Sequence, residues 1–264
     1  MPFGIGRMLM DESEKDKGFS KRAAFFDLDG TLIKGFMIRS FPRYLAQMGK
    51  IKEEIADNID LIVSAYERGD ASYSQVARKV PALYASGIKG IKISLMSALV
   101  RDFVDDYVPR NLFSYSKGLL DAAKSCFNLV IAISGSPQEV VEELKGKLGF
   151  DEGYGSLFTT NRSGAYTGTV KRNLILGSSK GRLLERLANS RSIDLSNSIA
   201  FGDTEEDEPL LRRVGHPIAL NPNFSLLKIC QKNGWPWYTE DRPPRLEILL
   251  QGFPKDKDDL IFRI

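Results

Sequence analysis

Three short apolar runs, each followed at once by a polar turn, constrain the fold more than any other feature of this sequence. They are residues 23–26, 129–133 and 198–201, and the turns after them begin Asp-Leu-Asp-Gly, Ser-Gly-Ser-Pro and Gly-Asp-Thr-Glu. Short apolar strands that lead into helical patterns are typical of a parallel sheet with both faces covered. Ligands of such sheets bind at the carboxyl ends of the strands. The sequence therefore predicts an α/β protein whose functional residues follow these three runs.

The long segment between the first two runs has a different pattern. Residues 36–110 carry apolar residues at helical spacing, as in Ile55, Ile59 and Ile62. We expect this segment to form an inserted helical-bundle cap. Residues 21–35 and 111–264 would form a Rossmann-like core, a parallel sheet with helices on both faces. Residues 1–20 are polar and are expected to be a flexible N-terminal tail.

Two local signals after the second run predict further elements. Residues 138–148 have a helical pattern, with Ser136 as the expected N-cap and Gly149 beyond the end. Residues 158–169 contain Asn-Arg-Ser-Gly and Tyr-Thr-Gly, which favour a hairpin.

Composition excludes several classes of protein. The chain has 264 residues, 42% of them hydrophobic, and a net charge of +3, which is typical of a folded domain and not of a disordered chain. Lys and Arg are scattered among acids, so no nucleic-acid partner is expected. No apolar run is long enough for a membrane span, and the N-terminus does not resemble a secretory signal. Two cysteines, Cys126 and Cys230, favour buried thiols over a single disulfide, so we expect a cytoplasmic protein.

Asp27 and Asp29 are the first candidates for chemistry. Residues two apart in an extended chain point to the same side, so the two carboxylates would repel each other unless a cation lay nearby. Oxygen ligands suit Mg²⁺. An Asp-x-Asp-Gly sequence also occurs in plain surface turns, but the apolar run directly before it favours the metal site.

These residues resemble the first motif of the haloacid dehalogenase superfamily, Asp27-Leu28-Asp29-Gly30-Thr31. Three further motifs of that family have counterparts in order, at Ser134, at Lys180 and in residues 202–207. Residues 131–137 and 215–222 resemble the phosphoserine-phosphatase-like subfamily IB, whose helical C1 cap also lies between the first two motifs. The resemblance covers residues 23–238.

The resemblance implies a role for each matching residue in phosphoryl transfer. Asp27 would be the nucleophile, Asp29 the general acid and base, and Lys180 a positive charge against Asp27 and the phosphate. Mg²⁺ would be held by the Asp27 carboxylate, the Asp29 carbonyl and the Asp203 carboxylate, and Asp207 would orient a bound water or Lys180. The implied phosphate-binding residues are Thr31, which would also hydrogen-bond within its loop, Ser134, Gly135 and Lys180. Taken singly, these residues have plainer interpretations. Ser134 fits a helix cap, Lys180 a solvated lysine, and residues 203–207 the acidic start of a helix.

The chain departs from the subfamily at two positions. Phosphoserine phosphatases carry an acidic residue nine positions after the nucleophile, where this chain has Phe36, so phosphoserine is disfavoured as the substrate. Glu206 would repel a phosphate unless its carboxylate turns away. Phe36, Arg39 and Arg43 are therefore the candidate substrate-selecting residues, although the two arginines also fit a solvated helix face.

The predicted function is Mg²⁺-dependent hydrolysis of a small phosphomonoester, from a metabolite or a lipid-like compound, through an aspartyl-phosphate. A phosphotransferase or mutase on the same scaffold is the first alternative. A non-catalytic scaffold protein is the second, and the presence of Asp27, Asp29, Lys180 and Asp203 disfavours it. The sequence specifies neither the natural substrate nor the oligomeric state.

Overall fold

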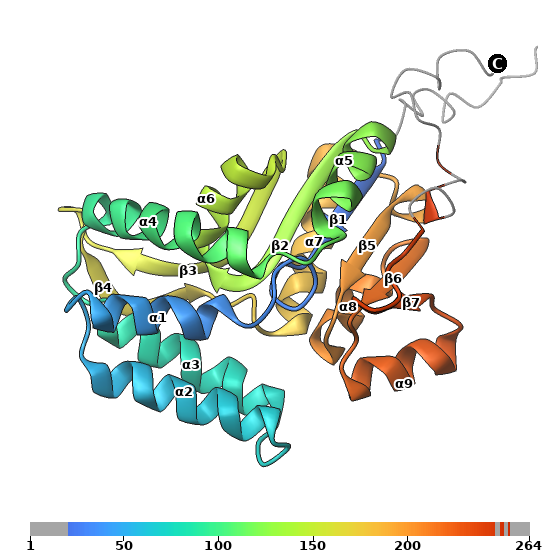
Figure 1. Cartoon of the computed structure of the whole chain (residues 1–264). Helices are drawn as coiled ribbons and strands as arrows, with labels where there is room; N and C mark the ends of the chain where they lie inside the picture. Colours follow the sequence, from blue (N-terminus) through green and yellow to red (C-terminus); the bar gives the residue numbers. More distant parts are fainter. Residues whose placement is uncertain (1–20, 246–248, 251–252, 254–264) are drawn as a thin grey trace, which may run out of the picture.

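A mainly parallel sheet forms the centre of the molecule in the computed structural model, which describes residues 21–245, 249–250 and 253. Within these residues, seven strands lie in the order β4-β3-β2-β1-β5-β6-β7 (Figure 1). All neighbouring strands are parallel except β3 and β4. The strands are β1 (Ala23–Phe26), β2 (Leu129–Pro137), β3 (Glu152–Thr160), β4 (Tyr166–Arg172), β5 (Ile199–Gly202), β6 (His216–Leu220) and β7 (Trp237–Tyr238). This sheet confirms the predicted α/β class; the expected tail, residues 1–20, lies outside the described residues.

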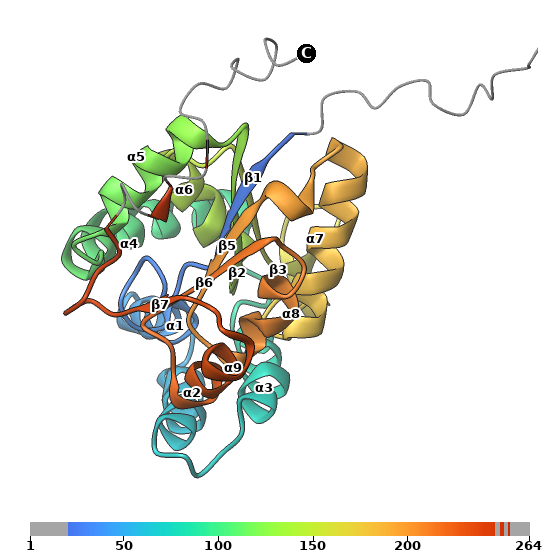
Figure 2. The same ribbon diagram turned by 90° about the vertical axis from the view of Figure 1, so that its right-hand side faces the viewer.

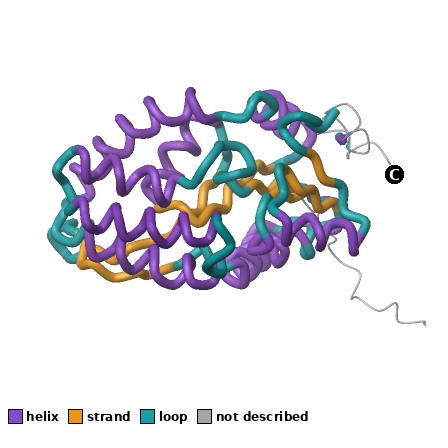
Figure 3. Tube along the Cα trace, turned by 60° about the horizontal axis from the view of Figure 1, so that its bottom comes forward, coloured by secondary structure: helices purple, strands orange, loops and turns teal. Residues whose placement is uncertain are grey.

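Strand β1 is apolar throughout because both of its faces are covered. Ala24 and Phe26 belong to one buried cluster, and Ala23 and Phe25 belong to another on the opposite face. Helices α5 and α6 cover the first face, and α7 and α8 cover the second (Figure 2). Strands therefore run through the centre, with helices above and below them (Figure 3). The bounds are α5 (Ser116–Cys126), α6 (Gln138–Leu148), α7 (Gly177–Arg191), α8 (Glu208–Leu211) and α9 (Phe224–Asn233), with short 3₁₀ turns η2 (Leu195–Asn197) and η3 (Glu205–Asp207).

Four helices lie between β1 and α5 in the described chain. They are α1 (Met37–Gln47), α2 (Glu53–Glu67), α3 (Tyr73–Gly87) and α4 (Ile93–Asn111). Helices α1, α2 and α3 pack on one another, whereas α4 lies beside α6 (Figure 1). Helix α3 also packs against β4. The division into a core and a cap at residues 36 and 110 stays a prediction. Among the described residues, no helix is both long and apolar enough to cross a membrane.

Local expectations were met in part. Helix α6 has the predicted bounds, and β3 and β4 form the predicted antiparallel hairpin, which extends beyond residues 158–169 at both ends. The expected N-cap was wrong: Pro137 occupies that position, and the Ser136 hydroxyl instead donates to Asp29. The reason is a tertiary contact, because the hydroxyl bonds to a carboxylate from a turn that is distant in the sequence.

Two buried tyrosines differ in whether their hydroxyl is paired. The Tyr84 ring of α3 packs edge-on against Phe158 of β3, with centroids 4.9 Å apart, but its buried hydroxyl has no partner among the described residues. The Tyr115 hydroxyl donates to the Thr31 carbonyl at 2.7 Å and accepts from the Asn221 amide at 2.7 Å. An unpaired buried hydroxyl is destabilising, whereas a paired one is not.

We therefore predict opposite effects for two identical substitutions. Tyr84→Phe should raise the free energy of unfolding by about 1 kcal/mol, because it removes an unsatisfied group. Tyr115→Phe should lower it by about 1–3 kcal/mol, because it leaves a carbonyl and an amide unpaired. Urea denaturation of both variants measures the difference. Equal destabilisation by the two substitutions would contradict this interpretation.

Candidate active site

The chain leaves β1 through a turn that requires glycine. Gly30 has a φ of +76°, and a Cβ at this position would lie 2.0 Å from Oδ2 of Asp203. The Thr31 hydroxyl donates to the other carboxylate oxygen of Asp203 at 3.1 Å. The turn after β1 therefore lies directly against the turn after β5.

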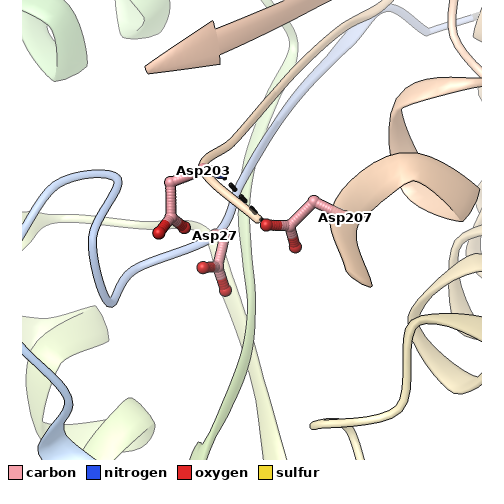
Figure 4. Close-up of side chains that lie close together, drawn as sticks. All are labelled: Asp27, Asp203 and Asp207. Carbon is pink, nitrogen blue, oxygen red and sulfur yellow. Dashed lines mark hydrogen bonds between the residues drawn. The ribbon is translucent and has the colours of Figure 1, made fainter. Parts of the chain in front are cut away.

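Three buried carboxylates meet at this edge of the sheet. Asp27 follows β1, and Asp203 and Asp207 follow β5 (Figure 4). One carboxylate oxygen of each lies within 4.8 Å of those of the other two. Oδ2 of Asp207 also accepts hydrogen bonds from the backbone N–H groups of Asp203 and Thr204, both at 3.1 Å. These bonds hold the loop after β5 in place around the carboxylates.

Lys180, on the first turn of α7, joins two of these carboxylates. Its ammonium donates to Oδ1 of Asp27 at 2.8 Å and to Oδ1 of Asp207 at 2.6 Å. The Lys180 side chain is only 3% exposed. Burial alone would lower the pKa of Lys180, but Asp207 and Asp27 outweigh burial and hold it well above its usual value. Lys180 therefore stays charged.

Negative charge is in excess at this edge. Four carboxylates, those of Asp27, Asp29, Asp203 and Asp207, face the single ammonium of Lys180. Burial, with repulsion from Asp207 and Asp29, raises the pKa of Asp27 to about 7 against the opposing effect of Lys180. Burial and repulsion from Asp207 and Asp27 raise the pKa of Asp203 well above its usual value. The protein alone therefore leaves these carboxylates short of positive charge.

Asp29 faces a different set of donors. Its Oδ1 accepts from the backbone N–H of Met37, the first residue of α1, at 2.6 Å. Its Oδ2 accepts from the hydroxyls of Ser136 at 2.7 Å and Ser134 at 3.3 Å. Burial raises the pKa of Asp29 even though these hydrogen bonds lower it. The carboxyl group is thus fixed in orientation, and its pKa lies above that of a free aspartate.

A small cavity of about 20 Å³ adjoins these groups. Its lining is Asp27, Asp29, Phe36, Ile38, Tyr73, Gly135, Ser136, Ile175, Lys180, Asp203 and Thr204. A larger hollow of about 500 Å³ lies at the start of β6, around His216 and Trp235, and no carboxylate lines it. The small cavity is therefore the better candidate for chemistry, despite its size.

The structure brings together most of the residues singled out in the sequence. Gly135 and Phe36 line the cavity with the carboxylates, whereas Thr31 and Ser134 do not line it and bond to Asp203 and Asp29. Arg39 and Arg43 do not line it. Their guanidinium groups bond to acids of α2, which are Asp57, Asp60 and Glu67.

Sequence reasoning missed two residues that line the cavity. One is Ser136, which was expected only as a helix cap. The other is Tyr73, the first residue of α3, which is partly buried. Burial raises the pKa of Tyr73 well above its usual value, and Lys180 and Asp27 lie near enough to influence it. No sequence pattern indicated Tyr73, because only the packing of α3 brings it to the sheet edge.

Glu206 turns away from the cavity. Its Oε2 accepts from the backbone N–H of Gly177 at 2.6 Å, at the start of α7. A Cβ on Gly177 would lie 2.1 Å from the Glu206 carbonyl oxygen, so the two segments are in close contact. Glu206 thus caps the helix that carries Lys180. Its carboxylate does not face the cavity, so the repulsion of phosphate expected from an inward-facing carboxylate does not arise.

This contact generates a prediction about α7. Glu206→Ala should lower the free energy of unfolding by about 1 kcal/mol, and Glu206→Gln, which keeps an acceptor oxygen, by less. Glu185→Ala on the exposed face of α7 is the control and should change it by about 0.5 kcal/mol or less. Thermal unfolding of the three variants measures how much each substitution lowers the stability. A Glu206→Ala effect no larger than that of the control would show that the cap contributes nothing.

Comparisons with known proteins agree with this geometry. The sequence profile of the haloacid dehalogenase-like hydrolase family matches residues 24–212. A protein of Streptomyces azureus described as an inhibition of morphological differentiation protein is 28% identical, over 88% of this chain and 83% of its own length. A probable phosphatase of Mycobacterium tuberculosis is 26% identical, over 86% of this chain and 78% of its own length.

Solved structures show the same fold. A protein of unknown function from Bordetella pertussis has a TM-score of 0.69 and 21% identity, covering 83% of this chain and 98% of its own. A phospho-aspartyl intermediate analogue of phosphoserine phosphatase has a TM-score of 0.62 and 21% identity, covering 89% of this chain and 100% of its own. At this identity the likeness concerns the fold alone. Because the family profile spans more than half of the sequence, and the carboxylates and Lys180 meet at one sheet edge, the chain belongs to the haloacid dehalogenase-like hydrolases.

Proposed function

We propose that this protein is a Mg²⁺-dependent phosphomonoester hydrolase that works through an aspartyl-phosphate on Asp27. The observation that carries the proposal is the buried cluster itself, with Lys180 between Asp27 and Asp207 and with Asp203 alongside. Phosphoryl transfer needs a positioned nucleophile and positive charge around the phosphate, and such a cluster supplies both once a cation is bound. The phosphatase description of a relative is consistent with this reaction.

The donor atoms fit a magnesium ion. Among the described residues, three oxygens at this edge accept no hydrogen bond: Oδ2 of Asp27, Oδ2 of Asp203 and the backbone carbonyl of Asp29. All three are the hard oxygen donors that Mg²⁺ prefers. Both carboxylate oxygens of Asp207 are already occupied, one by Lys180 and one by backbone N–H groups. We therefore assign the ion to Asp27, Asp29 and Asp203, with Asp207 holding Lys180. Bound there, Mg²⁺ would neutralise charge on the carboxylates and the phosphate.

Asp27 would carry the covalent step. Lys180 holds one of its carboxylate oxygens and favours its ionised form against the effect of burial, and Gly135 lines the same cavity. A carboxylate oxygen of Asp27 would attack phosphorus as the bond from phosphorus to the ester oxygen breaks.

Asp29 would move the proton in both steps. Three hydrogen bonds fix its orientation, and burial favours its protonated form. It would first give its proton to the ester oxygen of the leaving alcohol. As a carboxylate it would then take a proton from the water that attacks phosphorus. The bond between phosphorus and Asp27 breaks, inorganic phosphate leaves, and Asp29 is protonated again.

The metal assignment predicts a change in stability. Mg²⁺ at a hundredfold excess over its dissociation constant should stabilise the wild type by about 2.7 kcal/mol. Asp203→Asn should abolish this gain, yet without metal it should be no less stable than the wild type, because it removes a buried repelling charge. Asp102→Asn, on the exposed face of α4, should behave like the wild type. Thermal unfolding with and without Mg²⁺ makes the comparison, and an unchanged gain in Asp203→Asn contradicts the assignment.

The proposed reaction predicts phosphate release from p-nitrophenyl phosphate only when Mg²⁺ is present. Asp27→Asn should lower kcat by at least about a thousandfold, because the nucleophile is lost. Asp102→Asn should retain the wild-type rate. Adding glycerol as an acceptor separates hydrolysis from phosphotransfer, since a transferase would form glycerol phosphate in place of inorganic phosphate. Turnover that survives in Asp27→Asn would overturn the proposal.

A further inference from the structure

The inserted helices contribute no charged side chain to the cavity described above. Phe36, Ile38 and Tyr73 line it from the side of α1 and α3, and Ile175 lies on the core side. Every charged side chain in the lining comes from the core, and all of them belong to the proposed catalytic group or to the metal ligands. A leaving alcohol bound against α1 and α3 would therefore meet apolar carbon and one phenol.

The two arginines of α1 are held by acids of α2. The Arg39 guanidinium bonds to Asp60 at 2.8 Å, to Glu67 at 3.0 Å and to the Ser64 hydroxyl at 3.1 Å. The Arg43 guanidinium bonds to Asp57 at 2.7 Å and to Asp60. Both side chains thus tie α1 to α2 and provide no partner for a carboxylate on a substrate.

Tyr73 is the polar exception. Its ring packs edge-on against Tyr66, with centroids 5.2 Å apart, and the Tyr66 hydroxyl accepts from the Asn223 amide at 2.9 Å. The backbone N–H of Asn223 in turn donates to the carbonyl of Asp203 at 2.8 Å. The Tyr73 ring is therefore anchored to the loop that carries a metal ligand. Its hydroxyl has no hydrogen-bond partner among the described residues, and Tyr73 lines the cavity.

We propose that the substrate is the phosphate ester of a small alcohol with no charged group, and that Tyr73 donates a hydrogen bond to its phosphoryl oxygen. The inference rests on the proposed function of the same site. Phe36 and Ile38 contact the carbon atoms of the alcohol. A charged group at the far end of that alcohol, against α1 and α3, would be buried without a partner, which is strongly unfavourable. The cavity has room for about one water molecule, so it must widen to admit an ester.

Two matched pairs of esters test the substrate class. n-Propyl phosphate is compared with O-phosphoethanolamine, and isobutyl phosphate with phosphoglycolate, because each pair has nearly the same shape and differs in charge. We expect kcat/KM for the uncharged ester of each pair to be higher by about tenfold or more. p-Nitrophenyl phosphate reports in parallel on the proposed reaction. If wild type but not Asp27→Asn hydrolyses p-nitrophenyl phosphate, and neither uncharged ester is preferred, the inference about the substrate is overturned and the proposed hydrolase function stands. If Asp27-dependent hydrolysis is absent for every ester, both fail.

Tyr73→Phe tests the hydrogen bond. The change should lower kcat/KM for propyl phosphate and p-nitrophenyl phosphate alike by about ten- to a hundredfold, and should raise the inhibition constant of inorganic phosphate. Tyr44→Phe is the matched control, because Tyr44 lies on α1, packs against Phe41 and does not line the cavity. It should leave both constants unchanged. An unaltered inhibition constant in a folded Tyr73→Phe protein, shown by an unchanged melting temperature, would overturn the assignment of Tyr73.

Discussion

The buried ammonium of Lys180 holds together parts of the chain that are far apart in sequence. It bonds to Asp27 after β1 and to Asp207 after β5, while its own backbone lies in α7. Removing one partner from such a buried pair typically costs about 3–5 kcal/mol, because the remaining charge is left without compensation. The same bonds that place the proposed nucleophile therefore also position the helix and the loop around it. Glu206 strengthens this arrangement by capping α7 from that loop.

The single positive charge of Lys180 does not balance the negative charge of the carboxylates around it. One ammonium faces four carboxylates, and the raised pKa values of Asp27 and Asp203 reflect this imbalance. Such a cluster of like charges destabilises the fold when no cation is present, but its oxygen atoms suit a divalent cation. The cation would offset the negative charge of the carboxylates and of a bound phosphate. Asp29 links this chemistry to the inserted helices, because its carboxylate caps α1 at Met37. Movement of α1 would therefore change the surroundings of the proposed proton donor.

The sequence predicted the parts of this arrangement that depend on local pattern. Residues 23–26 are apolar because β1 is covered on both faces, and parallel strands bring Asp27 and Asp203 to one edge. The bounds of α6 followed from helical spacing. Ser136 and Tyr73 could not be found in this way, because their positions depend on contacts between segments far apart in the chain. The partners of Arg39 and Arg43 depend likewise on how α1 crosses α2, which spacing along one helix does not determine.

Covalent labelling of the nucleophile is the most direct test of the central claim. The protein would be mixed with Mg²⁺ and a phosphate ester carrying a radioactive phosphoryl group, quenched in acid within its first turnover, and digested for peptide mapping. The account predicts acid-stable label on the peptide that contains Asp27, and loss of that label on treatment with hydroxylamine, which cleaves acyl phosphates. Label on another residue, or phosphate release through many turnovers with no labelled peptide, would contradict it.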